Sequence, residues 1–299
     1  MSGQAIENLD PQGFSVWLAA ARPLTLTAAA APVMVGLALA DRTGHGNAML
    51  GLMTLLAALL IQIGTNLAND YFDFVAGADT AARLGPLRVT QAGLVEPSTV
   101  RNAALGVLGL AALIGCYLVS VGGWPILSIG IVSLVAAIAY TAGPWPLAYH
   151  GLGDAFVFIF FGLAAVNGTV FLQTGTATSL SIAASIPIAC LVTAILVVNN
   201  LRDVDTDARA GKHTLAVQFG PGFARAEYGG LVAIAFLMTP VLAWLGGAML
   251  LLPLAAAPLA FGEIRAICRR TGAELNQSLA RTAALHLAYG LLLTLALIL

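Results

Sequence analysis

The chain has 299 residues, of which 59% are hydrophobic and only 9% are charged, against about 25% charged residues in ordinary soluble domains. Its formal net charge is −1, so the basic surplus typical of nucleic-acid binding is missing. The composition excludes a soluble enzyme, a disordered protein and a nucleic-acid binder. It indicates a protein whose solvent is the lipid bilayer.

Segments without Asp, Glu, Lys or Arg predict where the chain crosses the membrane. The segments 102–153 and 155–201 are the longest of them, and each is long enough for two helical spans of about 20 residues. Gly122-Gly123-Trp124-Pro125 divides the first of these segments. We predict an all-α, polytopic membrane protein with nine transmembrane helices, at residues 24–41, 49–69, 102–120, 124–141, 153–173, 179–200, 228–245, 247–262 and 282–299.

The basic residues predict how this chain is oriented. If the N-terminus is cytoplasmic, 12 of the 13 Lys and Arg residues fall on inner segments, and Arg42 alone falls outside. This asymmetry follows the positive-inside rule, and nine spans then place the C-terminus outside. We expect residues 1–299 to form one membrane-embedded domain in the cytoplasmic (inner) membrane. Residues 1–22 would be a cytoplasmic segment without the features of a cleavable signal peptide.

A first acidic cluster closes the second predicted span, with the sequence NLANDYFD at residues 66–73. At about 100° per helical residue, Asn66, Asp70 and Asp73 fall on one stripe. Neighbouring carboxylates repel one another, and a divalent cation relieves that repulsion. Carboxylate and amide oxygens are the ligands that Mg²⁺ prefers, so this stripe predicts one half of a magnesium site.

A second acidic cluster closes the sixth predicted span, with the sequence NNLRDVDTD at residues 199–207. Asn199, Asp203 and Asp207 form its stripe, and Asp205 points away as a solvated charge. By the predicted topology both clusters lie at inner span ends and can face one cavity. Basic residues follow each cluster: Arg83 and Arg88 after the first, and Arg202, Arg209 and Lys212 after the second.

Two metal-binding acidic clusters with cations nearby fit a diphosphate ligand, whose charge the metal and the cations neutralise together. Either cluster alone could be a helix cap or an interfacial polar group. The matched Asn-x-x-x-Asp starts in both clusters favour a shared site instead. We expect Asn66 and Asn199 to contribute to diphosphate binding.

These clusters resemble the Asp-rich motifs of the UbiA superfamily of intramembrane prenyltransferases, whose first motif reads Asn-x-x-x-Asp-x-x-x-Asp. The second cluster fits this spacing, whereas the first has Phe74 at the last position and carries Asp73 instead. That departure is similar to the 1,4-dihydroxy-2-naphthoate polyprenyltransferase branch. Further blocks similar to that branch lie at residues 21–26, 69–73, 85–88, 140–144, 151–154, 172–173 and 211–216.

The resemblance implies a nine-helix bundle whose central cavity opens laterally to lipid. It implies that a polyprenyl diphosphate binds through Mg²⁺, with Asp70, Asp73, Asp203 and Asp207 as metal ligands and catalytic residues. The acceptor would be 1,4-dihydroxy-2-naphthoate, which is prenylated with loss of its carboxylate to give demethylmenaquinone, diphosphate and CO₂. The cavity would face the cytoplasm.

Each of the other polar residues has two possible roles. Arg22, Arg88 and Lys212 are either diphosphate ligands or inner-face anchors. Tyr140 and Tyr149 either cap the cavity or belong to an interfacial aromatic belt. Asp154 either orients the acceptor or caps a helix.

Two other functions remain open from the sequence. One is a prenyltransferase of the same superfamily with another acceptor, such as 4-hydroxybenzoate. The other is a cation transporter that uses the carboxylates as ion ligands. Transporter sites lie near the bilayer midplane, whereas these acids lie at span ends beside Arg and Lys, which disfavours transport.

Overall fold

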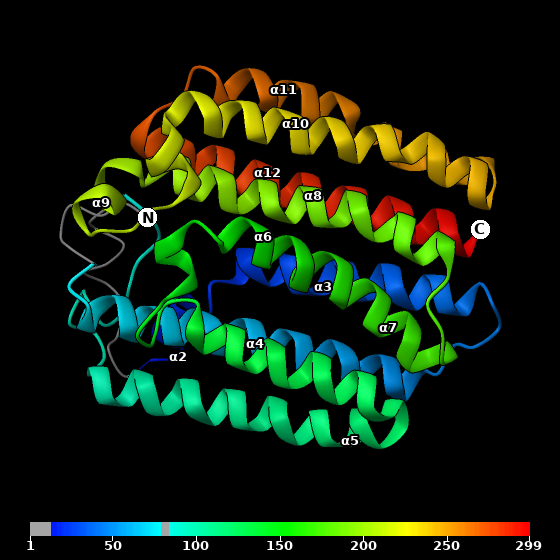
Figure 1. The fold of residues 1–299 in the computed structure, drawn as a ribbon, viewed down its shortest axis with the longest axis horizontal. Coiled ribbons are helices and arrows are strands. Elements are labelled where there is room, and N and C mark those ends of the chain that lie inside the picture. The colour runs from blue at the N-terminus through cyan, green and yellow to red at the C-terminus, as the bar shows by residue number, and fades with distance from the viewer. Residues whose placement is uncertain (1–12, 79–83) are drawn as a thin grey trace.

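A computed structural model describes residues 13–78 and 84–299, and every regular element in these two segments is a helix. Arg83 and the acidic residues Glu7 and Asp10 lie outside the described residues. The α-helices, labelled as in Figure 1, are α2 (Phe14–Ala21), α3 (Pro23–Asp41), α4 (Ala48–Val75), α5 (Pro97–Ala139), α6 (Gly153–Val157), α7 (Ala165–Thr174), α8 (Ser179–Arg202), α9 (Val204–Arg209), α10 (Leu215–Gly246), α11 (Ala257–Ile267) and α12 (Leu275–Ile298).

Four shorter elements complete the fold. Three are 3₁₀ helices: η1 (Leu147–His150), η3 (Ala248–Ala256) and η4 (Gly272–Glu274). The fourth, η2 (Phe158–Ala164), is a π-helical segment that joins α6 to α7. Such segments are rare and frequently lie at functional sites.

Eight helices among the described residues are long and apolar enough to cross a membrane. This result confirms the prediction of an all-α polytopic membrane protein, whereas the count of nine spans stays a prediction. The predicted spans 102–120 and 124–141 both lie within α5, which has 43 residues. Gly123 adopts φ 64° and ψ −150° there, a conformation open to glycine but costly for other residues. The ribbon turns back on itself at this point (Figure 1).

Local signals in the sequence set several helix starts. The side chain of Asn47 accepts the N–H of Leu50 at 3.0 Å and caps α4. Thr178 and Ser181 form a reciprocal capping box at the start of α8. Such caps satisfy backbone N–H groups that have no partner within the helix.

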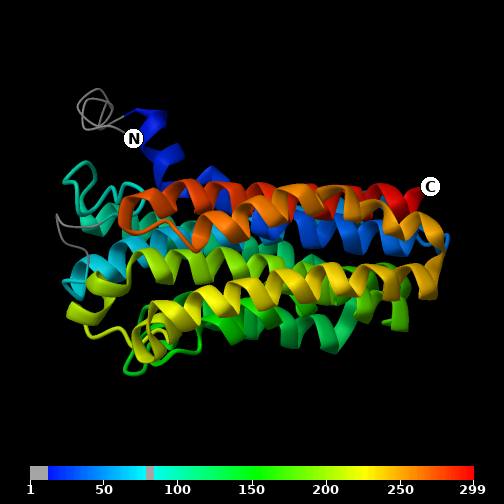
Figure 2. The ribbon, with the colours of Figure 1, turned by 90° about the horizontal axis from the view of Figure 1, so that it is seen from above.

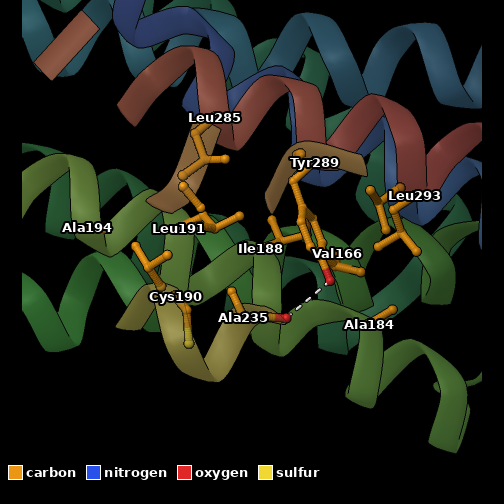
Figure 3. Close-up of a cluster of buried hydrophobic side chains, with 14 of the residues drawn as sticks. Val166, Ala184, Ile188, Cys190, Leu191, Ala194, Ala235, Leu285, Tyr289 and Leu293 are labelled. Atoms are coloured by element: carbon orange, nitrogen blue, oxygen red, sulfur yellow. Dashed lines mark hydrogen bonds between the residues drawn. The ribbon is translucent and has the colours of Figure 1, made fainter. Parts of the chain in front are cut away.

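Helix α8 lies in the interior of the bundle and packs against both α10 and α12, while α12 also packs against α3. Their shared core contains Ile188 and Leu191 from α8 and Leu285 and Leu293 from α12 (Figure 3). Within this core Tyr289 donates a hydrogen bond to the backbone oxygen of Ala235 at 3.2 Å. Helices α4 and α5 pair on the other side of the molecule.

The outer surface carries large apolar side chains. Leu113 is 70% exposed, Trp244 84% and Phe261 65%. Apolar exposure on this scale is rare in soluble monomers and fits contact with lipid. The helices run roughly along one direction, with α2 and α9 at one end of the bundle and the C-terminus at the other (Figures 1 and 2).

Candidate active site

A cavity of about 730 Å³ lies between α3, α4, α5, α8 and the segment from α6 to α7. Along α4 its lining extends from Thr54 to Asp73, which corresponds to roughly 28 Å of helix at 1.5 Å per residue. Both acidic clusters line this cavity, together with Arg22, Arg88 and Lys212. Much of the remaining wall is apolar and includes Ile129, Phe160, Phe161 and Leu172.

Asp73 links the first cluster to two cations. Its Oδ2 accepts a hydrogen bond from Arg88 at 2.8 Å, and its Oδ1 accepts one from Lys212 Nζ at 3.0 Å. Asp73 is 2% exposed and Arg88 is 5% exposed. Lys212 lies 139 residues after Asp73 in the chain, so this pair ties the two cluster regions together. Charge-assisted pairs of this kind are stronger than neutral hydrogen bonds.

Asp70 is buried but does not line the cavity. Its two carboxylate oxygens accept the backbone N–H groups of Val89 at 3.0 Å and Thr90 at 3.1 Å. These amides begin a turn in which Ala92 donates back to the oxygen of Arg88. Asp70 therefore holds the segment that carries Arg88, which differs from the prediction that it faces the metal.

Asn66 lies on the cavity wall, as its stripe predicts. Its side-chain amide donates to the oxygen of Ala21 and to the hydroxyl of Thr25, both at 2.9 Å. Arg22, between these two partners, is the one non-glycine residue with positive φ among the described residues, at 52°. Positive φ is uncommon outside glycine and requires support from the surroundings. Asn66 thus stabilises the junction of α2 and α3 and places Arg22 at the cavity.

The second cluster is built around Arg202, whose side chain is buried. Its guanidinium donates to both carboxylate oxygens of Asp203, at 2.8 and 2.6 Å, and to the side-chain oxygen of Asn199 at 2.8 Å. Helix α8 ends there, and Asp203 links it to α9. Asn199, Asp203 and Asp207 all line the cavity, as predicted, whereas Asp205 is exposed and does not.

Tyr149 lies beside Lys212 rather than on the cavity wall. Lys212 Nζ is 5.1 Å from the centre of the Tyr149 ring, and the N–H of His213 donates to the backbone oxygen of Tyr149 at 3.0 Å. A cation over a tyrosine face is attracted by the ring. Tyr149 thus helps to fix the lysine that pairs with Asp73.

Tyr140 and Asp154 both line the cavity. Tyr140 follows the last residue of α5. Burial raises the pKa of its phenol well above the ordinary value, and the carboxylates of Asp154, Asp73 and Asp207 add to this effect. The phenol therefore stays neutral and able to donate a hydrogen bond.

The structure adds Asn69 and Thr141, which the sequence reasoning did not single out. Both line the cavity, and the Thr141 hydroxyl donates to the side-chain oxygen of Asn69 at 2.9 Å. Asn69 precedes Asp73 by four residues, as Asn199 precedes Asp203. That repeated spacing is the signal that could have identified it.

The donors present suit a hard divalent cation shared with a phosphate. Four carboxylates, those of Asp73, Asp154, Asp203 and Asp207, and several amide oxygens line one cavity, and these are the ligand types that Mg²⁺ prefers. Within the described residues, however, no three His, Cys, Asp or Glu side chains gather closely enough to hold a metal alone. Mg²⁺ commonly binds through one or two carboxylates together with substrate phosphates, so the residues fit a site that the diphosphate completes.

Comparisons with known proteins identify the family to which this chain belongs. Residues 29–292 match the UbiA prenyltransferase family. The 1,4-dihydroxy-2-naphthoate octaprenyltransferase of Mycobacterium tuberculosis is 38% identical over 93% of this chain and 95% of its own length. The enzyme of the same name from Escherichia coli is 38% identical over 85% of each chain.

More distant relatives share the fold. UbiA prenyltransferase domain-containing protein 1 of Danio rerio is 32% identical over 93% of this chain and 82% of its own length. A UbiA homologue from Archaeoglobus fulgidus, solved with DMAPP and Mg²⁺, superposes with a TM-score of 0.63 at 15% identity, covering 94% of this chain and 98% of its own. The chain therefore belongs to the UbiA prenyltransferase family, as its acidic motifs predict.

Proposed function

We propose that this protein transfers a polyprenyl group from polyprenyl diphosphate to 1,4-dihydroxy-2-naphthoate, with loss of CO₂, to give demethylmenaquinone in menaquinone biosynthesis. One observation supports this most strongly. Acid clusters from α4 and from α8–α9, with their cations, line the same cavity as a long apolar wall. Such a cavity has room for a charged headgroup and a hydrocarbon tail, and the relatives named for this reaction resemble the chain over most of its length.

We propose that Asp73, Asp203 and Asp207 hold Mg²⁺, with amide oxygens of Asn69 and Asn199 beside them. When bound, Mg²⁺ neutralises charge on the departing diphosphate. Asp70, which the sequence placed among these ligands, supports the neighbouring segment through Val89 and Thr90.

The cations of the site have a second partner when substrate is present. Arg88 and Lys212 pair with Asp73 in this structure, and a diphosphate offers them more negative charge than one carboxylate does. We propose that both turn to the phosphate oxygens, joined by Arg22, which frees Asp73 for the metal. Preorganised cations of this kind stabilise charge that develops on a leaving group.

The apolar wall protects the reacting carbon. As the bond between C1 and the diphosphate oxygen breaks, positive charge develops on the allylic carbon, and water would capture it as an alcohol. Side chains such as Phe160 and Phe161 line the cavity and exclude water from this carbon. The electron-rich ring of the acceptor is then the available nucleophile.

The membrane setting completes the proposal. We propose that residues 1–299 act as one domain in the cytoplasmic (inner) membrane, with the acidic end of the cavity toward the cytoplasm. Helices α2 and α9 lie at one end of the bundle and the C-terminus at the other (Figure 1), as this orientation requires, and the distribution of Lys and Arg assigns the first end to the cytoplasm.

An acceptor panel tests the proposed reaction. Purified protein receives one polyprenyl diphosphate, Mg²⁺ and, in separate reactions, 1,4-dihydroxy-2-naphthoate or 4-hydroxybenzoate, and mass spectrometry identifies the products. We expect the prenylated, decarboxylated naphthoate product. Conversion of 4-hydroxybenzoate but not of the naphthoate would replace this proposal with the alternative acceptor.

A further inference from the structure

Asp154 is a buried carboxylate with one oxygen that no described residue satisfies. It is 7% exposed and lines the cavity. Its Oδ1 is buried without a hydrogen-bond partner among the described residues. Leaving a buried charged group unsatisfied is costly, so its retention in the cavity wall points to a ligand that completes it.

A purely structural role does not account for Asp154. It lies in the first turn of α6, but the residue that caps this helix is Leu152, and no side-chain cap is formed. No Lys or Arg forms an ion pair with Asp154 among the ion pairs of the described residues. The Asp154 carboxylate interacts with its own backbone N–H at the start of α6, but this contact leaves Oδ1 without a partner among the described residues.

The surroundings of Asp154 define the kind of ligand that fits. A Cβ built on the adjacent Gly153 would lie 3.0 Å from the Tyr140 hydroxyl oxygen, so a neutral phenol borders the same part of the cavity. A diphosphate would be repelled by the carboxylate. The proposed metal ligands Asp73, Asp203 and Asp207 belong to the clusters at the ends of α4 and α8–α9, whereas Asp154 lies on α6, outside both clusters. What suits a carboxylate here is a neutral hydrogen-bond donor.

We propose that Asp154 Oδ1 accepts a hydrogen bond from a phenolic hydroxyl of the aromatic acceptor, and that Asp154 and Tyr140 together form the acceptor subsite. This inference rests on the proposed prenyl transfer and adds where the ring binds. Asp154 then orients the ring beside the diphosphate end of the cavity. Oδ1 thereby gains the partner that the described residues do not supply.

A binding cycle that combines protein variants with acceptor analogues tests this contact. Asp154→Leu removes both carboxylate oxygens, Asp154→Asn keeps one acceptor oxygen, and Asp205→Asn changes an exposed carboxylate outside the cavity as the matched control. Each protein is titrated with 1,4-dihydroxy-2-naphthoate, 1-hydroxy-2-naphthoate and 4-hydroxy-2-naphthoate, and binding is measured directly by calorimetry. The KM of polyprenyl diphosphate is measured in parallel.

We expect Asp154→Leu to weaken binding of the dihydroxy acceptor by about ten- to a hundredfold, the range for a hydrogen bond to a charged group. Asp154→Asn should lose less, while the KM of the diphosphate changes less than twofold in both. One of the two monohydroxy analogues should bind wild-type protein about as weakly as the dihydroxy acceptor binds Asp154→Leu. The affinity for that analogue should fall by less than twofold further in the Asp154→Leu variant. Gel filtration would show whether the Asp154→Leu protein is misfolded. In that case the same titrations are made with Asp154→Asn in its place.

The proposed contact would be refuted if Asp154→Leu weakened the binding of all three naphthoates equally. It would also be refuted if the substitution changed only the KM of polyprenyl diphosphate. If wild-type protein binds no naphthoate, the proposed function fails instead. The same cycle with 4-hydroxybenzoate and benzoate then decides whether Asp154 binds a phenolic hydroxyl.

Discussion

The role of Asp70 gives the sharpest test of how the site is built. Asp70→Asn retains one oxygen for the N–H of Val89 or Thr90 but turns an NH₂ donor toward the other. Hydrogen bonds to a charged group contribute about 1.5–3 kcal/mol each, so losing one and weakening the other costs about 2–4 kcal/mol at this buried position. The cost falls on the turn that follows Arg88, which can open locally without unfolding of the bundle.

Hydrogen exchange measures this local opening. A loss of about 2–4 kcal/mol corresponds to roughly thirty- to several-hundredfold faster exchange of the Val89 and Thr90 amides. We expect turnover to fall because Arg88 is no longer held in place. The Mg²⁺ concentration for half-maximal activity should stay within about twofold of wild type. Asp205→Asn serves as the control for a charge change outside the cavity.

A metal ligand would give the opposite pattern in the same variant. If Asp70→Asn raised the half-saturating Mg²⁺ concentration tenfold while the exchange of Val89 and Thr90 stayed unchanged, Asp70 would be a metal ligand, and the positioning role would be refuted. Asp73→Asn, measured alongside, shows the response of a residue that does line the cavity.

Three further substitutions test other parts of the account. Lys212→Gln should raise the KM of polyprenyl diphosphate by about tenfold, the effect of one lost charge-assisted contact, with little change in the KM of the acceptor in steady-state assays. Arg202→Lys should lower both thermal stability and turnover, since a lysine cannot reproduce the two-pronged contact with Asp203; an unchanged melting curve would contradict this. Gly162→Ala should destabilise the protein by about 1–3 kcal/mol, because its Cβ would overlap the Cα and Cβ of Ala189, and a melting temperature equal to wild type would show that the π-helical segment can move aside.

The fold could be anticipated largely from hydrophobicity and glycine placement. The reversal predicted at Gly122-Gly123 occurs inside α5, where Gly123 takes a positive φ. The predicted bounds of the spans differ from the bounds of the helices, because helices continue through polar residues beyond the apolar segments. Helix α4 extends to Val75 through the first acidic cluster, and α10 begins at Leu215, well before the predicted start at residue 228.

The acidic stripes were predicted from helical geometry, and that geometry set their limits. Asp73 and Asn66 reach the cavity as expected. Asp70 lies on the same stripe, but the amides that it binds come from a turn 19 and 20 residues later, which no local periodicity predicts. Asn69 was missed because Asn66 offered the same spacing to Asp70, although Asn69 is the residue four positions before Asp73.

Ion pairs between distant segments could not be derived from the sequence either. Arg270 and Arg281 are among the basic residues that the sequence places on inner segments, and in the structure they lie 3.1 and 3.8 Å from the carboxylate oxygens of Glu263. Glu263 is 1% exposed, and one buried carboxylate leaves no periodic signal. These contacts depend on how α11 folds against α12, which is a property of packing rather than of local pattern.

The shared magnesium site is tested most directly by the binding of a polyprenyl diphosphate analogue that cannot react, such as a thiolo-diphosphate, with and without Mg²⁺. If both acidic clusters share the metal around one diphosphate, wild-type protein binds the analogue only with Mg²⁺. Each single substitution, Asp73→Asn or Asp203→Asn, should then abolish the Mg²⁺-dependent binding of the analogue. Equal affinity with and without Mg²⁺, or normal Mg²⁺-dependent binding in either variant, would contradict a site shared by the ends of α4 and α8.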